Sequence, residues 1–248
     1  MSKATLDQIS TLPPQGASKE EFLPKIEALQ EKLADIHDRL IAQRKYSILI
    51  ILQGMDASGK DGTVKHALGS LQLAGARVKA FKVPTAEENA HHFLWRISKE
   101  CPEKGMVQIF NRSQYEGILV PKVNGTLPDK LLKQRCEEIN SFEAGLMRDN
   151  TLVFKFYLHV SEAEQRERLA ERMQDPAKRW KYQPEDIAAI DQHKAFAKVY
   201  DFIFEHGSQG APWYIIPADK KWYRNHEVLR LLVQELEKLP IAYPEIDK

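Results

Sequence analysis

Residues 54–62 have the residue types and the spacing of a phosphate-binding loop. They read Gly54-Met-Asp-Ala-Ser-Gly-Lys-Asp-Gly62 and contain the pattern G-x-x-x-x-G-K, preceded by an apolar run. Small residues let successive backbone N–H groups converge on an anion, and a lysine adds a full positive charge. Similar clusters occur in ordinary turns, but the complete spacing favours phosphate binding. The predicted binding residues are Gly54, Ala57, Ser58, Gly59, Lys60, Asp61 and Gly62.

Two acids make this loop unusual. Asp61 follows Lys60 where the standard pattern has Ser or Thr, so the usual hydroxyl ligand for Mg²⁺ is missing. Asp56 is the nearest carboxylate, and Mg²⁺ prefers hard oxygen ligands of this kind. We therefore expect Asp56 to bind the metal. The alternative is that Asp56 only stabilises the turn through its own backbone.

A second candidate segment, Phe110-Asn-Arg-Ser-Gln-Tyr-Glu116, follows another apolar run. In phosphate-loop enzymes an acid near the magnesium ion usually stands at this point. Asn111 occupies that place here, and we expect Glu116 to restore the carboxylate directly or through water. Arg112 would face the transferring phosphoryl group, because a planar guanidinium can hold two oxygens at once. The alternative for Arg112 and Glu116 is an ordinary surface ion pair.

A third candidate segment, residues 164–186, mixes basic and acidic side chains. Its composition alone is typical of a solvated helix face. However, the helix is expected to end at Asp175-Pro176, and a short cationic cluster with an aromatic residue follows. Such a segment could close over a chain of phosphates and exclude water, as mobile lids do. The cations are Arg166, Arg168, Arg172, Lys178, Arg179 and Lys181.

Five apolar or β-branched runs predict the strands that position these segments. They cover residues 46–53, 77–83, 106–110, 151–160 and 213–216, with helical patterns between them. Strands that alternate with helices predict a parallel sheet covered on both faces, with ligands at the carboxyl ends of the strands. Ser161-Glu-Ala-Glu164 predicts a capping box that starts a helix after the fourth strand.

Residues 1–44 precede the predicted phosphate-loop domain, which spans residues 45–248. Residues 1–17 contain two prolines and few large apolar groups, so they are expected to form an extended arm. An amphipathic helix is predicted from Glu20 to Gln43. We expect its apolar stripe to pack on the domain's own sheet; the alternative is a contact in a homo-oligomer, because heptad-like spacing also suits helix pairing. The stripe consists of Phe22, Ile26, Leu29, Leu33, Ile36 and Leu40.

Composition narrows the function classes. The chain has 248 residues, 43% of them hydrophobic, and a formal net charge of +1. This charge argues against a nucleic-acid binder, so a phosphate-rich ligand must be met by locally clustered cations. No apolar run approaches the ~18 residues of a membrane span, and Cys101 and Cys136 lack the spacing of a metal site. We expect a cytoplasmic protein.

Taken in order, these segments resemble the polyphosphate kinase type 2 family over roughly residues 45–239. Further matching motifs are Phe93-Leu-Trp-Arg96, Asp175-Pro-Ala-Lys-Arg-Trp-Lys181 and the stretch 211–224, which ends in Trp222-Tyr-Arg224. The resemblance implies an α/β, three-layer P-loop kinase fold with a central parallel sheet, helices on both faces and a helical lid at about 164–186. It also implies reversible, direct in-line transfer of a phosphoryl group between inorganic polyphosphate and a nucleotide, with Mg²⁺, or Mn²⁺ in its place, as cofactor.

The resemblance also implies roles for individual residues. Asp56 looks like the acid that binds magnesium and orients the accepting phosphate, and Lys60 like the group that neutralises the transferring phosphoryl. Arg112 resembles the arginine that bridges donor and acceptor phosphates. Asn111 and Glu116 are similar to the class III subgroup, whose members phosphorylate both nucleoside mono- and diphosphates. The candidates for holding the polyphosphate or the nucleotide are Arg166, Arg172, Lys178 and Lys181 on the lid, with Lys65, Lys82 and Arg96.

The chain departs from the family pattern after Tyr115-Glu116, where related chains commonly carry an Arg and a His and this one has Lys122 and Asn124. Two alternatives remain open. An ATP-dependent nucleoside-monophosphate kinase would have a similar fold and loop. A non-catalytic P-loop binding module is suggested by Asn111, which stands where an acid is expected.

Overall fold

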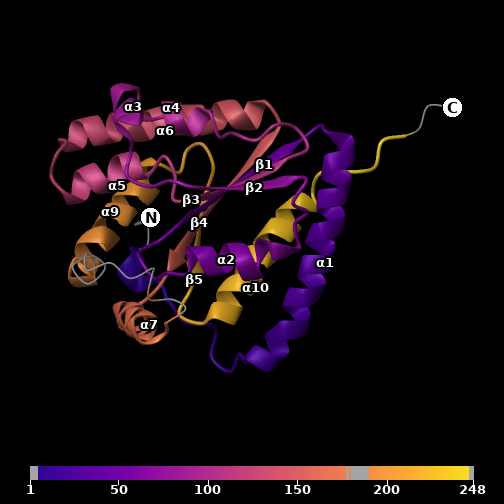
Figure 1. Ribbon diagram of the computed structural model, residues 1–248, viewed down its shortest axis with the longest axis horizontal. Helices are drawn as coiled ribbons and strands as arrows, with labels where there is room; N and C mark the ends of the chain where they lie inside the picture. Colours follow the sequence, from indigo (N-terminus) through magenta and orange to yellow (C-terminus); the bar gives the residue numbers. More distant parts are fainter. Residues whose placement is uncertain (1–4, 177–178, 180–189, 246–248) are drawn as a thin grey trace.

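The computed structural model describes residues 5–176, 179 and 190–245, and within them five strands form one parallel sheet in the order β2-β3-β1-β4-β5 (Figure 1). Each predicted strand is confirmed, with ends that differ by up to three residues. The strands are β1 (Ser47–Gln53), β2 (Ala76–Ala80), β3 (Val107–Asn111), β4 (Thr151–His159) and β5 (Trp213–Pro217).

Helices cover both faces of this sheet, which confirms the predicted three-layer α/β architecture. Because side chains alternate along a strand, Ile48 and Ile50 of β1 pack with residues of α1 and α10, while Leu49 and Ile51 pack with residues of α4 and α6. Figure 1 shows the same arrangement, with α1 and α10 on one side and α6 on the other. The helices are α1 (Lys19–Gln43), α2 (Lys60–His66), α3 (Ala86–Ala90), α4 (Trp95–Ser98), α5 (Glu116–Val123), α6 (Asp129–Arg148), α7 (Glu162–Gln174), α9 (His193–His206) and α10 (Lys221–Leu236).

Helix α1 begins one residue before its predicted start and is capped by Ser18, whose hydroxyl accepts a hydrogen bond from the Glu21 N–H. Its apolar stripe lies mainly against α10, and its residues Leu33, Ile36 and Leu40 belong to the same core cluster as Ile48 and Ile50 of β1. The Phe22 ring, for example, meets the ring of His226 edge-on at 4.6 Å. An amphipathic pattern specifies that a face must be buried, but it does not specify the element that buries it.

The N-terminal arm is docked along the end of β4. Leu6 is buried, and its N–H donates to Asp201 Oδ1 at 2.9 Å. The His159 Nε2 atom lies 3.1 Å from both the Leu6 and the Ile9 carbonyl oxygens. Leu6 and Ile9 therefore anchor the arm to the core, while most of residues 5–17 are exposed.

The segments with candidate chemistry follow the carboxyl ends of the parallel strands, at one edge of the sheet. The phosphate loop follows β1, residues 112–115 follow β3, and α7 follows β4. Helix α7 ends at Gln174, directly before Asp175-Pro176 as predicted. Only half of the expected capping box forms: the Ser161 hydroxyl accepts from the Glu164 N–H, while the Glu164 carboxylate instead accepts from Arg168 Nε at 2.8 Å.

Among the residues described, no helix combines the length and the apolar character needed to cross a membrane.

Candidate active site

The phosphate loop adopts a conformation that only small residues at its key positions allow. A Cβ atom at Gly54 would lie 2.7 Å from Ser58 Oγ and 2.8 Å from the Leu158 carbonyl oxygen. Gly59 has a φ of +103° and directly precedes α2, and Ala57 has a left-handed φ of +60°. The predicted spacing thus matches close approaches that a larger side chain would prevent.

Lys60 lies buried over the start of the loop. Its Nζ donates to the Gly54 carbonyl oxygen at 2.7 Å and to the Met55 carbonyl oxygen at 3.1 Å. Burial, reinforced by the nearby positive charge of Arg112, lowers the pKa of Lys60 to about 8, although the carboxylates around it oppose the shift. A phosphate group in the cradle would supply the negative charge that keeps this ammonium protonated.

Arg112 brings two predicted acids together. Its Nη2 lies 2.8 Å from Asp56 Oδ1, and its Nη1 lies 3.9 Å from Glu116 Oε2. The Arg112 backbone has a left-handed φ of +65°, and its N–H donates to the Leu52 carbonyl oxygen of the neighbouring strand. Arg112 and Glu116 therefore do form the ion pair of the alternative interpretation, but the shorter pair, with Asp56, joins the segment after β3 to the phosphate loop.

Gln53, the last residue of β1, was not among the predicted site residues. Its buried Nε2 donates to Glu116 Oε1 at 3.1 Å and lies 3.2 Å from Ser113 Oγ. Gln53 therefore orients the Glu116 carboxylate. Its signal in the sequence was a polar residue at the end of an otherwise apolar strand.

These residues border a cavity of about 110 Å³. One part of its wall is polar or charged, with Asp56, Arg112 and Glu116, and another is apolar and aromatic. The complete lining is Gly54, Met55, Asp56, Arg112, Glu116, Leu119, Val120, Gln165, Phe196 and Tyr200. A cavity lined by both charged and apolar side chains suits a ligand that has both a phosphate and a ring.

Asn111 contacts Asp61, the second acid of the phosphate loop. Its Nδ2 donates to Asp61 Oδ1 at 2.7 Å. Within the described part of the chain, no group of three or more His, Cys, Asp or Glu side chains is assembled as a metal site. Mg²⁺ usually binds one or two carboxylates, substrate phosphates and water, so the oxygen donors of Asp56, Glu116 and Asn111 fit this ion.

The structure places the other predicted cations in different surroundings. Lys65 and Lys82 are exposed. Arg96 Nη1 donates to the Lys82 carbonyl oxygen at 2.9 Å, and Arg166 Nη2 pairs with Glu162 and Asp191 on the surface. Arg172 lies near the end of α7. Lys178 and Lys181 lie outside the described residues, as does most of the predicted lid beyond Pro176.

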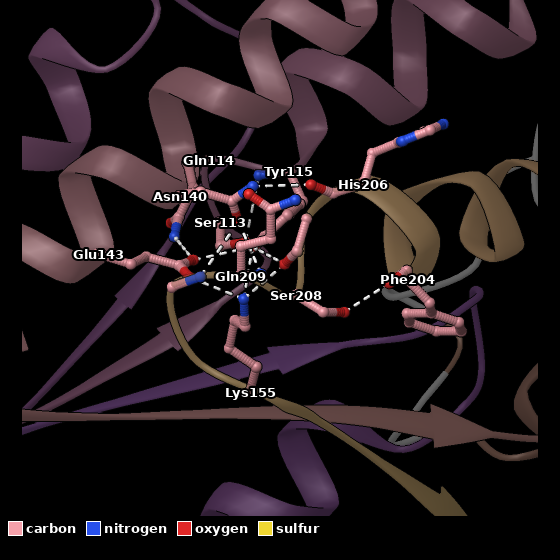
Figure 2. Close-up of polar contacts among 12 residues, drawn as sticks. Ser113, Gln114, Tyr115, Asn140, Glu143, Lys155, Phe204, His206, Ser208 and Gln209 are labelled. Atoms are coloured by element: carbon pink, nitrogen blue, oxygen red, sulfur yellow. Dashed lines mark hydrogen bonds and ion pairs between the residues drawn. The ribbon is translucent and has the colours of Figure 1, made fainter. Parts of the chain in front are cut away.

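A buried polar network supports the segment after β3 (Figure 2). Lys155 Nζ lies 2.6 Å from Glu143 Oε2, and both side chains are 0% exposed. Gln114 Nε2 donates to Glu143 Oε1 at 3.0 Å, and the Tyr115 hydroxyl lies 2.7 Å from Lys155 Nζ. Glu116 directly follows these anchored residues. Sequence reasoning missed this network, although a lysine between Phe154 and Phe156 was a visible signal.

Two buried arginines, Arg168 of α7 and Arg224 of α10, lie against the phosphate loop. The sequence had marked Arg168 only as one of six cations, and Arg224 only as the end of a motif. No local pattern distinguishes a buried arginine of this kind from an exposed one.

Comparison with known proteins was consistent with this geometry. The family model described as "Polyphosphate kinase 2 (PPK2)" matches residues 16–242. An AMP/ADP-polyphosphate phosphotransferase of Meiothermus ruber is 40% identical over 92% of this chain and 85% of its own length. An ADP-polyphosphate phosphotransferase of Rhodopseudomonas palustris is 34% identical, over 92% and 83% respectively.

Among solved structures, that of polyphosphate kinase 2 from Arthrobacter aurescens TC1 matches with a TM-score of 0.95 and 36% identity. The match covers 100% of this chain and 90% of the Arthrobacter chain. The P-loop kinase fold predicted from the sequence is thereby confirmed.

Proposed function

The chain belongs to the polyphosphate kinase 2 family, and on that basis we propose that it transfers a phosphoryl group from inorganic polyphosphate to nucleoside mono- and diphosphates, reversibly. The observation that carries this proposal is the convergence of Asp56, Lys60, Arg112 and Glu116 on one cavity and its adjoining loop. The acceptor range, which corresponds to class III, is supported by the name of the 40% identical Meiothermus ruber relative.

In the proposed reaction the protein acts by positioning and electrostatics. The loop N–H groups and Lys60 hold the transferring phosphoryl group, and Arg112 lies where it can contact both donor and acceptor phosphates. Transfer is direct and in line, so no residue forms a covalent intermediate. Phosphate oxygens would replace Asp56 and Glu116 as partners of the Arg112 guanidinium, which frees both carboxylates for other ligands.

The cofactor in this proposal is Mg²⁺, for which Mn²⁺ can substitute. The residues that would hold it are Asp56 and Glu116, with Asn111 as a neutral donor. When bound, the ion supplies positive charge to the phosphate oxygens. Asp56 lies beside Nη2 of Arg112 and Glu116 beside Nη1, so both acids lie next to the guanidinium that would contact the phosphates.

The apolar part of the cavity wall supports the assignment of the nucleoside to this side of the site. Phe196 and Tyr200 of α9 and Leu119 of α5 line the same cavity as Asp56 and Glu116. A nucleoside packed there would direct its phosphates toward the loop. We also propose that the protein works in the cytoplasm, where nucleotides are available; a homo-oligomer remains a prediction from the sequence.

The test is a product assay with polyphosphate and each of AMP, ADP, GMP and GDP, without ATP. We expect ATP to form from ADP and polyphosphate. Loss of one major transition-state donor typically lowers the rate by about 10²–10³-fold. Lys60→Ala and Arg112→Ala should therefore lose at least this much activity, while the surface variant Lys238→Ala should not. A parallel assay supplies AMP and ATP without polyphosphate; product in that assay alone would instead identify an ATP-dependent monophosphate kinase.

A further inference from the structure

Two arginines that no motif assigns to the reaction lie against the phosphate loop. Arg168 of α7 is 5% exposed and Arg224 of α10 is 2% exposed. Buried arginines are rare unless each is paired or hydrogen-bonded. The position of both against one short loop therefore requires an explanation.

Arg168 uses all of its hydrogen-bond donors to join three parts of the fold. Its Nη1 donates to the carbonyl oxygens of Ala57 and Ser58, at 2.9 and 3.0 Å. Its Nη2 donates to the carbonyl oxygens of Ala218 and Asp219 after β5, at 2.6 and 3.1 Å. Its Nε donates to Glu164 Oε1 of the same helix. A guanidinium has five N–H groups in a rigid plane, and a lysine could not reproduce this set.

These contacts determine the direction in which a loop peptide points. The C=O and N–H groups of one trans peptide point in opposite directions. Because Arg168 holds the Ser58 carbonyl, the N–H of Gly59 is turned away from the arginine. Ala57, whose carbonyl is held in the same way, has the left-handed φ of +60° that such a loop needs. Arg168 thus maintains a backbone conformation in which N–H groups can face an anion.

Arg224 fills the space that the loop glycines leave. A Cβ atom at Gly59 would lie 1.9 Å from Arg224 Nη1, and one at Gly62 would lie 3.2 Å from Nη2. The Arg224 Nε and Nη2 donate to Asn225 Oδ1, and within the described residues no carboxylate pairs with this guanidinium. Burial and the nearby Arg168 lower the pKa of Arg224 to about 10. Because this pKa is still well above neutral pH and the hydrogen-bond partner Asn225 is neutral, the charge of Arg224 is available to stabilise negative charge at the loop.

We propose that Arg168 and Arg224 are positioning residues for phosphoryl transfer: Arg168 holds the loop peptides in their anion-binding orientation, and Arg224 supports the loop at Gly59 with shape and charge. The inference rests on the proposed function, since it assigns these residues to the same loop. Neither side chain is required to touch the reacting atoms.

The experiment compares Arg168→Met, Arg168→Lys and Arg224→Met with the matched control Arg230→Met. Arg230 lies on the same helix, α10, with its side chain 42% exposed, and it pairs with Glu227, which is 15% exposed. Four quantities are measured for each protein: the melting temperature, kcat and KM with ADP and polyphosphate at 25 °C, and the affinity for inorganic tripolyphosphate by calorimetry. Arg168→Lys keeps the charge but loses the planar contacts, so it remains informative if Arg168→Met does not fold.

We expect both Arg168 variants to lose about 10²-fold in kcat, as is typical when catalytic groups are misplaced by about 1 Å. We expect Arg224→Met to bind tripolyphosphate about tenfold more weakly, with Arg230→Met at the wild-type value. A purely structural role would lower the melting temperature while folded variants kept wild-type kcat and tripolyphosphate affinity, and this result would overturn the inference. A wild-type protein whose affinity for tripolyphosphate depends on Arg168 and Arg224 but which transfers no phosphoryl group would overturn the proposed function instead.

Discussion

Replacing Glu143 with Gln would leave the Lys155 ammonium buried without its counter-charge. The two side chains are 0% exposed and 2.6 Å apart, so water cannot take the place of the carboxylate. Glutamine has nearly the same shape, but its amide nitrogen cannot accept a hydrogen bond, so the negative charge and one accepting oxygen are lost together. Removing one partner of a buried ion pair costs about 3–5 kcal/mol. At roughly 2–4 °C per kcal/mol for a chain of this size, the melting temperature should fall by about 6–20 °C.

A second variant separates charge from packing. The double change Glu143→Gln with Lys155→Met removes both charges, and replacement of a whole buried pair by neutral side chains is often close to neutral. We expect the double variant to recover more than half of the stability that Glu143→Gln loses. The surface pair of Lys238 and Glu235 provides the control, and Glu235→Gln should change stability by no more than about 0.5 kcal/mol.

The pH dependence gives a further check. Burial lowers the pKa of Lys155, and the charge of Glu143 opposes that shift, so the pKa falls further in Glu143→Gln. At pH values between this lowered pKa and the value of about 10.4 in the unfolded chain, the unfolded state binds more protons than the folded state. The free energy of unfolding of the variant should therefore rise more steeply with pH than that of the wild type, and the gap between them should narrow from pH 7 toward pH 10.

Urea unfolding followed by tryptophan fluorescence would measure these free energies, because the Trp213 ring centroid lies 5.3 Å from Lys155 Nζ. The reasoning would be refuted if Glu143→Gln cost less than about 1 kcal/mol. It would also fail if the double variant lost the sum of the two single losses, because a direct ion pair must show coupling.

The remaining predictions concern the reaction and the loop. Because burial lowers the pKa of Lys60 to about 8 in the protein without ligand, kcat/KM should fall as pH rises above 8. Lys60→Arg should remove this fall in kcat/KM at high pH. A flat wild-type profile from pH 7 to 9.5 would contradict the role of a protonated Lys60. Glu116→Gln should raise the Mg²⁺ concentration needed for half-maximal rate, and an unchanged titration curve would exclude Glu116 as a metal ligand. Gly54→Ala, whose Cβ would lie 2.7 Å from Ser58 Oγ, should weaken tripolyphosphate binding by at least tenfold, whereas Gly69→Ala, at a position with open space, should bind normally.

Local patterns were sufficient for the sheet and for the centre of the site. The apolar runs predicted the central strands β3, β1 and β4 because a strand buried on both faces must be apolar at nearly every position. The edge strand β2 is largely exposed and mixes apolar with charged residues, and its predicted end was three residues too late. The phosphate-loop spacing was also predictive, since only glycine fits the approaches at Gly54 and the backbone at Gly59. Placing Arg112 and Glu116 near that loop required only the rule that parallel strands end at one edge.

The tertiary structure decided which side chains those elements meet. Arg166 and Arg168 lie on the same helix, yet one pairs on the surface and the other is enclosed by loop carbonyls. The sequence likewise predicted an apolar face for α1 but not its packing on α10. Glu143, Lys155 and Arg224 obtain their roles from residues that are distant in the chain. Periodicity and propensity act over a few neighbouring residues, whereas burial, pairing of charges and support of the loop depend on how separate elements pack in space.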